Sequence, residues 1–121
     1  SEADGTAVEF NYEIQSNAIE EKTSLMMKDI LRQVVEEGGG KKAYLEGFSI
    51  GGKTATSQKL PRGSGKYISS FIGFSPVDNA KVIAMCLIDE PQGIYYGGTI
   101  AAPVIRELFE NILPYLEIQN N

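Results

Sequence analysis

The segment Gly47 to Gln58, GFSIGGKTATSQ, contains the residue types best suited to chemistry in this chain. Two glycines separated by four residues, followed by Lys and then Ser or Thr, form the pattern of a phosphate-binding loop. In such a loop the backbone N–H groups and the lysine hold phosphates, and the hydroxyl binds magnesium. The residues that fit this pattern are Gly47, Gly52, Lys53 and Thr54.

A second segment is consistent with the same interpretation. Val82 to Glu90, VIAMCLIDE, is an apolar run that ends in two acids. A strand of this kind can present Asp89 to a magnesium ion. One hypothesis is therefore a nucleotide-binding module that uses Gly47 to Thr54 as its phosphate loop.

The same residues also suit an active-site strand. Lys53, Thr54 and Ala55 are close to the Lys-Thr-Gly triplet that serine acyl-transferases carry on such a strand. Strand alternation puts Lys53 on one side and the hydroxyls of Thr54 and Thr56 on the other. If this is an edge strand, a nearby backbone N–H is free for a ligand, and an extended peptide can pair with the edge.

The residues after Thr54 favour the strand. A phosphate loop needs a helix that begins at its Lys-Thr, because the helix N-terminus supplies the N–H donors and the dipole. Here ATSQKLPRGSGKY follows, and the breakers Pro61, Gly63 and Gly65 leave little room for a helix. The strand Lys81 to Asp89 also follows its neighbour through a tight turn, which predicts antiparallel pairing instead of a parallel βαβ frame.

A helix is predicted before this strand. Asn17 followed by Glu20 has the form of an N-cap with its partner at the third helical position. The helix is expected to stop at the glycines 38–40. Apolar residues recur at helical spacing and are expected to pack in the core: Met26, Met27, Ile30, Leu31, Val34 and Val35.

Further strands and a second helix follow. Tyr67 to Ser75 and Lys81 to Asp89 are rich in β-branched and aromatic residues and are bounded by turn residues. A final helix is predicted from Thr99 to before Pro114, with an apolar stripe at Val104, Ile105, Leu108, Phe109 and Ile112. The predicted fold is α+β, a three-stranded antiparallel meander flanked by two helices.

The first 16 residues differ from the rest. They are polar apart from the alternating apolar residues between Val8 and Ile14, and they indicate an extended arm or a strand. We therefore divide the chain into an arm, residues 1–16, and a folded portion, residues 17–121.

The composition of the chain makes several classes of function unexpected. The 121 residues suffice for one domain, and the net charge of −5 makes nucleic acid an unexpected partner. The chain has no His, which removes Ser-His-Asp catalysis and most zinc sites, and no cofactor is expected. Its one cysteine, Cys86, cannot form an internal disulfide and is expected to be buried. The longest apolar runs are far shorter than the ~20 residues needed to span a bilayer.

A longer stretch of the chain resembles a known family. From about Ile19 to Ile118 the sequence is similar to the C-terminal part of the transpeptidase domain of class B penicillin-binding proteins. Three segments carry the resemblance in family order: VVEEGGGKKAYLEGFSIGGKTATSQK (34–59), KYISSFIGFSPVDNAKVIAMCLIDEP (66–91) and YYGGTIAAPVIRELF (95–109). The implied fold is part of the penicillin-binding protein and β-lactamase type.

The resemblance implies a role for each residue of the Lys-Thr-Ala-Thr strand. Lys53 would set the electrostatics around the catalytic serine. The hydroxyls of Thr54 and Thr56 would bind the carboxylate of a peptidoglycan stem peptide or a β-lactam, and the backbone N–H of Thr56 would donate into the oxyanion hole. The implied reaction is cell-wall cross-linking by acyl transfer through a serine ester, at the outer face of the cytoplasmic membrane, with the membrane anchor outside this chain.

The chain departs from the family pattern in two respects. Ala55 stands where the triplet ends in Gly, so a methyl group is added on the Lys53 side, and altered β-lactam binding is expected. No serine here fits the Ser-x-x-Lys or Ser-x-Asn motif, since Ser24 is followed by Lys28, one residue too far. We therefore expect the nucleophile in a missing upstream part, an inactive chain on its own, and self-association through uncovered apolar surface. A non-catalytic, partner-binding domain remains a further alternative.

Overall fold

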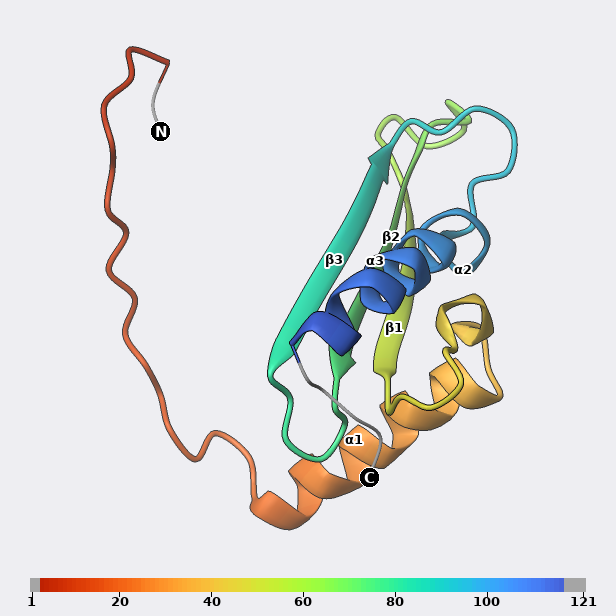
Figure 1. Ribbon diagram of the computed structural model, residues 1–121. Helices are drawn as coiled ribbons and strands as arrows, with labels where there is room; N and C mark the ends of the chain where they lie inside the picture. Colours follow the sequence, from red (N-terminus) through yellow and green to blue (C-terminus); the bar gives the residue numbers. More distant parts are fainter. Residues whose placement is uncertain (1–2, 117–121) are drawn as a thin grey trace.

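The computed structural model describes residues 3–116 and has an α+β fold, as predicted. A three-stranded antiparallel sheet has the strand order β1-β2-β3, and Figure 1 shows helix α3 lying across one of its faces. The elements are α1 (Glu21–Glu36), a 3-10 turn η1 (Lys41–Ala43), β1 (Gly51–Gln58), β2 (Tyr67–Ser75), β3 (Val82–Asp89), α2 (Gly97–Ile100) and α3 (Ala102–Tyr115).

The strand register defines two faces of the sheet. Cross-strand partners point to the same side, so Thr54 shares a face with its partner Phe71, and Lys53 shares the opposite face with Ile72. We call the first the helix face, because α3 packs on it, and the second the outer face. Along β3 the side chains alternate between half-buried on the helix face and exposed on the outer face.

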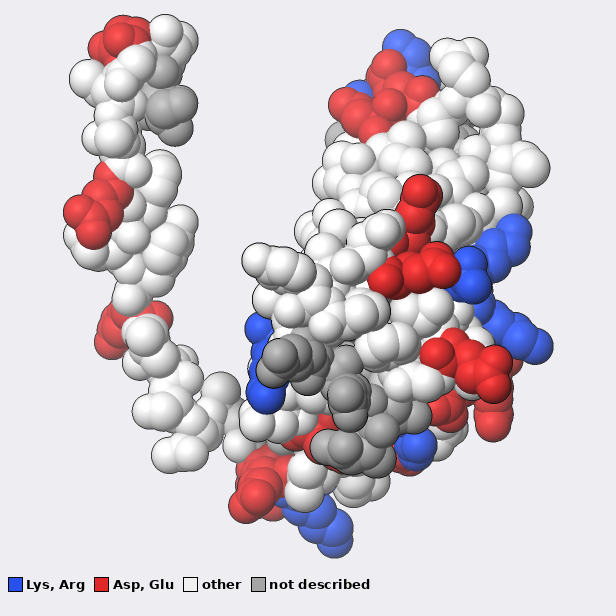
Figure 2. All heavy atoms as spheres, in the orientation of Figure 1, with Lys and Arg blue, Asp and Glu red and all other residues white. Residues whose placement is uncertain are grey.

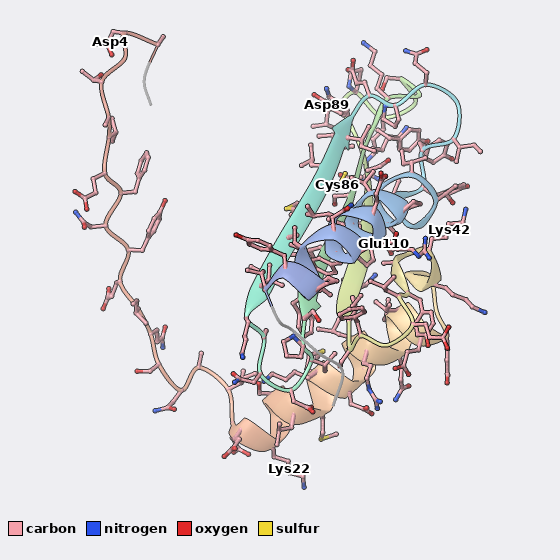
Figure 3. The ribbon with its side chains drawn as sticks, viewed as in Figure 1. Asp4, Lys22, Lys42, Cys86, Asp89 and Glu110 are labelled. Atoms are coloured by element: carbon pink, nitrogen blue, oxygen red, sulfur yellow. The ribbon has the colours of Figure 1, made fainter. Side chains whose placement is uncertain are left out.

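The core lies between the helix face and α3. Phe71, Ile105 and Phe109 are fully buried there with other apolar side chains. Gly73 of β2 allows the close approach, since a Cβ at that position would stand 3.0 Å from Ile105 and 3.3 Å from Phe109. Cys86 also lies on the helix face but is only half-buried (Figure 3), so the expected full burial of this thiol is wrong.

Helix α1 differs from the prediction at both its start and its packing. It begins at Glu21, with Glu20 as an N-cap that makes no side-chain cap bond. Asn17 instead has a positive φ of 57°, a conformation that Asn tolerates, and belongs to a turn. Of the predicted stripe only Val35 is fully buried, whereas the predicted core packing is wrong for Met26, Met27 and Ile30, which are exposed.

The final helix is divided in two. The short α2 is followed, after Ala101, by α3, which has a Pro in its first turn and continues through Pro114 to Tyr115. The predicted end before Pro114 is therefore wrong. A proline in the last turn removes a single backbone hydrogen bond, which the helix end tolerates more readily than the interior.

The N-terminal arm has no helix or strand over residues 6–15, and it stands away from the folded body in Figure 1. Its apolar side chains Val8, Phe10, Tyr12 and Ile14 are all exposed. The predicted division at residues 16 and 17 remains a prediction, and the chain ends 1–2 and 117–121 lie outside the described residues.

Candidate functional site

The Lys-Thr segment lies within an edge strand. Lys53 and Thr54 are the third and fourth residues of β1, which pairs with β2 and has no second strand beside it within residues 3–116. The chain stays extended from Gly51 to Gln58, and no helix begins at Lys53. The phosphate-loop interpretation is therefore wrong, because its lysine and hydroxyl must sit at the start of a helix.

Lys53 and Ala55 share the outer face, as the alternation predicted. The Lys53 ammonium group donates to the backbone carbonyl of Thr54 at 3.0 Å and to the Thr54 hydroxyl at 3.4 Å, and the residue remains exposed. The register places Ala55 opposite Ser70, two residues along from Lys53, and its methyl group is exposed. The Lys53 side chain thus starts on the outer face and turns toward Thr54, while the Ala55 methyl group stays on the open outer face.

The two threonines line one pocket on the other side of β1. It has a volume of about 380 Å³ and contains the side chains of Thr54 and Thr56. The end of α1, the η1 turn and the start of α2 complete it through Gly38, Gly39, Lys41, Lys42, Tyr96, Gly97, Gly98 and Thr99. Four residues with a hydroxyl group (Thr54, Thr56, Tyr96 and Thr99) and two lysines make this pocket chemically suited to a carboxylate.

The loop before α2 also contacts this strand, which the sequence did not predict. The backbone N–H of Gly97 donates to Thr56 Oγ1 at 3.1 Å. The Tyr95 ring stacks on Tyr67 with ring centroids 3.8 Å apart and 4° between the planes. A hydrogen bond with Tyr95 raises the pKa of the neighbouring Tyr96. Tyr95-Tyr96-Gly97-Gly98 could be recognised in the sequence only as a turn.

Asp89, proposed above as a magnesium ligand, lies at the end of β3 (Figure 3). Lys59 donates to Asp89 and to Glu90, each at 3.0 Å, and these bonds raise the pKa of Lys59. Among residues 3–116 there is no group of three or more metal-ligating side chains. The ion pair between Lys59 and Asp89 therefore links the β1–β2 connection to the end of β3.

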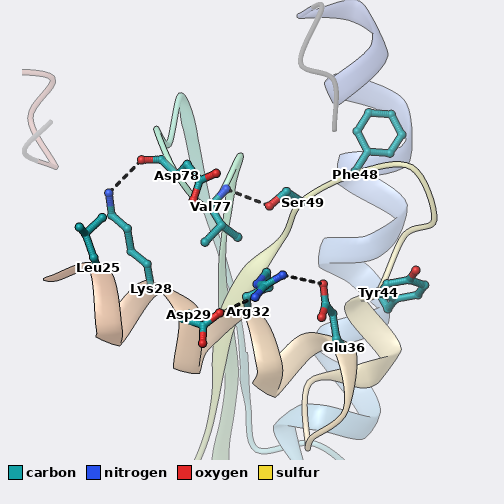
Figure 4. Close-up of a pocket in the computed structure, with 10 residues that line it drawn as sticks. All are labelled: Leu25, Lys28, Asp29, Arg32, Glu36, Tyr44, Phe48, Ser49, Val77 and Asp78. Atoms are coloured by element: carbon teal, nitrogen blue, oxygen red, sulfur yellow. Dashed lines mark hydrogen bonds and ion pairs between the residues drawn. The ribbon is translucent and has the colours of Figure 1, made fainter. Parts of the chain in front are cut away.

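A larger pocket of about 510 Å³ lies between α1 and the turn after β2 (Figure 4). Its arginine is paired within the chain. Arg32 forms ion pairs with Asp29 and Glu36, and Lys28 donates to the Asp78 carbonyl at 3.1 Å. Two carboxylates thus offset the charge of Arg32, whereas Lys28 bonds to a neutral carbonyl.

The surface and the helices add two further observations. On the face shown in Figure 2, acidic and basic side chains are interspersed, and no cationic patch gathers there. Within the described part of the chain, none of the helices is long and apolar enough to cross a bilayer.

Solved structures with the same fold define the class to which this architecture belongs. The chain superimposes on the transpeptidase domain of the FtsI4 D,D-transpeptidase from Legionella pneumophila with a TM-score of 0.70 and 31% identity, covering 78% of this chain and 37% of that one. It also matches the fold of penicillin-binding protein 3 from Mycobacterium tuberculosis, with a TM-score of 0.74 and 24% identity over 98% of this chain and 30% of that one. The fold is thus part of a penicillin-binding protein transpeptidase domain.

Sequence comparison gives the family. Residues 6–110 match the penicillin binding protein transpeptidase domain, and the chain belongs to this family. It is 38% identical over 109 residues to stage V sporulation protein D of Bacillus subtilis, covering 87% of this chain and 17% of that protein. It is 35% identical over 126 residues to the probable peptidoglycan D,D-transpeptidase PenA of Neisseria flavescens, covering 95% of this chain and 32% of that protein. The match confirms the resemblance seen in the sequence, and it includes the arm from Thr6 onward.

Proposed function

We propose that this chain is the substrate-binding part of a peptidoglycan D,D-transpeptidase. The observation that carries the proposal is the arrangement on β1, where Thr54 and Thr56 line one pocket and the Lys53 ammonium group lies 3.4 Å from the Thr54 hydroxyl. The family membership and the similarity to probable D,D-transpeptidases support it. The chain spans only 17% and 32% of the two curated relatives described, so the activity belongs to a larger assembly.

In the proposed reaction the hydroxyls of Thr54 and Thr56 bind the terminal carboxylate of a stem peptide. A serine oxygen attacks the neighbouring acyl carbon, an ester forms as the amide bond breaks, and the serine proton leaves with the departing amine. The Thr56 backbone N–H stabilises the oxyanion in this step. An amine of a second peptide then displaces the serine and completes the cross-link. A β-lactam would enter the same site and remain as the ester.

The serine must come from residues outside this chain, and we propose that these residues cover the outer face and continue past the free edge of β1 to the threonine pocket. Apolar side chains on the outer face are exposed in the described part of the chain. Their exposed fractions are 38% for Ile72, 68% for Ile83, 59% for Met85 and 56% for Leu87. An upstream part that covered this surface would bring a nucleophile toward the Lys53 ammonium group while burying apolar area. Because the substrate is cell-wall peptidoglycan, we place the full protein at the outer face of the cytoplasmic membrane.

The test is acylation of the full-length protein by a fluorescent penicillin. Replacing Thr54 by Val removes the hydroxyl and keeps the shape, and a hydrogen bond to a charged group contributes about 1.5–3 kcal/mol. We therefore expect Thr54→Val to slow acylation by about 10- to 150-fold. Thr23→Val is the matched control, because it makes the same substitution at an exposed position of α1 outside the threonine pocket.

Two results would contradict the proposal. If Thr54→Val and Thr23→Val acylate at the same rate, the threonine pocket is not the carboxylate site. The second result is a full-length protein that has an intact Ser-x-x-Lys motif and does not react with penicillin at all. That result would favour the alternative of a non-catalytic, partner-binding domain, with Ala55 as the mark of a lost active site.

A further inference from the structure

The loop Tyr95 to Gly98 is held against the site by a pair of hydroxyls. Thr56 and Ser69 are direct cross-strand partners in β1 and β2, so their side chains lie next to each other on the helix face. Ser69 Oγ donates to the Tyr95 carbonyl, and Thr56 Oγ1 accepts from the Gly97 N–H at 3.1 Å. Two adjacent side chains thus bind the same loop at positions two residues apart.

The loop fits this place closely. The Tyr95 ring lies flat on Tyr67, the first residue of β2. A methyl group on Gly97 would meet the carbonyl oxygens of Ser70 and Ala55, the latter at 2.8 Å. Only a glycine therefore allows the backbone at position 97 to approach β1 and β2 this closely.

The bond from Gly97 determines what Thr56 can offer a ligand. A hydroxyl has one donor hydrogen and two acceptor lone pairs. With a lone pair occupied by the Gly97 N–H, the Thr56 hydrogen is directed away from that N–H. The hydroxyl then suits an anion, to which it must donate, better than a ligand that donates to it.

We propose that Ser69 and Tyr95 are positioning residues for Thr56. Through the Ser69 to Tyr95 hydrogen bond and the Tyr67 to Tyr95 stack, they hold the Gly97 N–H on Thr56 Oγ1 and so direct the Thr56 hydroxyl at the ligand carboxylate. This inference rests on the proposed function in assigning the carboxylate to Thr56. The hydrogen-bonding device itself is a property of this chain alone.

The chain provides a matched control. Ser69 and Ser75 are both fully buried residues of β2, and each donates its hydroxyl to a backbone carbonyl 26 residues away. Ser69 holds Tyr95 beside the site, whereas Ser75 holds Ser49 at the other end of the strand at 2.6 Å. Ser69→Ala and Ser75→Ala therefore remove the same kind of bond from the same strand, and only one of them touches the loop.

The first measurement is amide hydrogen exchange of this chain by NMR. We expect Ser69→Ala to speed exchange at Gly97 by about tenfold relative to the Phe71 amide in the middle of β2, because the loop opens locally. Ser75→Ala should leave the ratio of these two exchange rates unchanged. Tyr67→Leu removes the half-buried stacking ring without changing the core, and it should also raise the ratio of the Gly97 to the Phe71 exchange rate. It replaces Ser69→Ala as the test variant if Ser69→Ala does not fold.

The second measurement is the acylation rate of the full-length protein by benzylpenicillin. Ser69→Ala should slow it by about tenfold and Ser75→Ala should not, at equal thermal stability. Equal Gly97 exchange in the wild type and in both Ser69→Ala and Tyr67→Leu would overturn the positioning device. Faster exchange at Gly97 without any change in acylation would overturn the link to the ligand. A wild type that penicillin does not acylate would instead overturn the proposed function. The Gly97 exchange rates would still show whether Ser69 and Tyr67 hold the loop on Thr56.

Discussion

Ala55 is the residue at which this chain departs from the Lys-Thr-Gly triplet of its family. The structure places its methyl group on the outer face beside Lys53, where it is exposed and contacts no core. The methyl group can therefore act on a ligand or on a covering segment, but it does little for the packing of this chain.

We predict that Ala55→Gly speeds acylation of the full-length protein by penicillin. Removing the methyl group opens the surface beside Lys53, and a barrier lower by about 0.7–1.4 kcal/mol corresponds to a three- to tenfold faster reaction. The same change should lower the free energy of unfolding by about 0.5–1 kcal/mol, because glycine loses more backbone entropy on folding. An acylation rate identical to that of the wild type would show that the methyl group has no bearing on the ligand.

Among the site residues, the sequence predicted the arrangement along β1 but not the contact of β1 with the loop before α2. The alternation of a strand places Lys53 opposite Thr54 and Thr56, because it depends only on neighbours along the chain. The contact between Gly97 and Thr56 joins residues 41 positions apart. No local pattern carries such a contact, which exists only once the sheet and α2 are packed together.

The two long helices differ in how many of their side chains are buried in the core. Helix α3 packs along the helix face, and its buried residues Ile105, Phe109 and Leu113 follow helical spacing. Helix α1 contacts the body mainly through its C-terminal half, where Val35 is buried. Most of the fully buried helical side chains therefore belong to α3, whereas Val35 is the one fully buried residue of α1.

We predict that Phe109→Ala lowers the free energy of unfolding by about 3–5 kcal/mol, since it empties a fully buried site against Phe71. Leu108→Ala, on the neighbouring exposed position of the same helix, should change it by less than about 1 kcal/mol. Urea denaturation followed by far-ultraviolet circular dichroism measures both. Similar losses in the two variants would mean that α3 does not pack on the sheet as described.

The element order and the antiparallel meander followed from periodicity and turn residues, which are local signals. The start of α1 did not, because Asn17 has two local options, a helix cap and a left-handed turn, and adopts the second. The exposure of Met26 and Met27 could not be predicted either. A helical stripe specifies an apolar face, while the partner for that face need not lie in the same chain.

For the whole molecule, the largest feature is apolar surface without a partner among the described residues. The outer face of β3, the first turns of α1 and the arm all expose apolar side chains. The strand β3 also has a neighbour on one side only, which leaves its other edge free for pairing. Such a molecule is expected to bind an additional segment or a copy of itself.

We predict that the chain self-associates in a concentration-dependent way and that Met85→Glu shifts it toward the monomer, because a charge on the outer face opposes burial of that face. Leu60→Glu is the control, since Leu60 is equally apolar and more exposed but lies in the β1–β2 connection. Sedimentation velocity over a concentration series distinguishes these outcomes. A wild type that stays monomeric throughout would contradict this expectation.

The tyrosine pair beside the site also has an optical consequence. The chain has six tyrosines and no tryptophan, so tyrosine dominates its near-ultraviolet absorption. Tyr67 and Tyr95 lie parallel at 3.8 Å in a fixed, chiral setting, an arrangement that couples their electronic transitions. Displacement of the loop from β2 would abolish this coupling while the rest of the fold stayed intact. The protein thus contains a built-in chromophore, through which the state of its binding strand can be followed by near-ultraviolet circular dichroism without any added label.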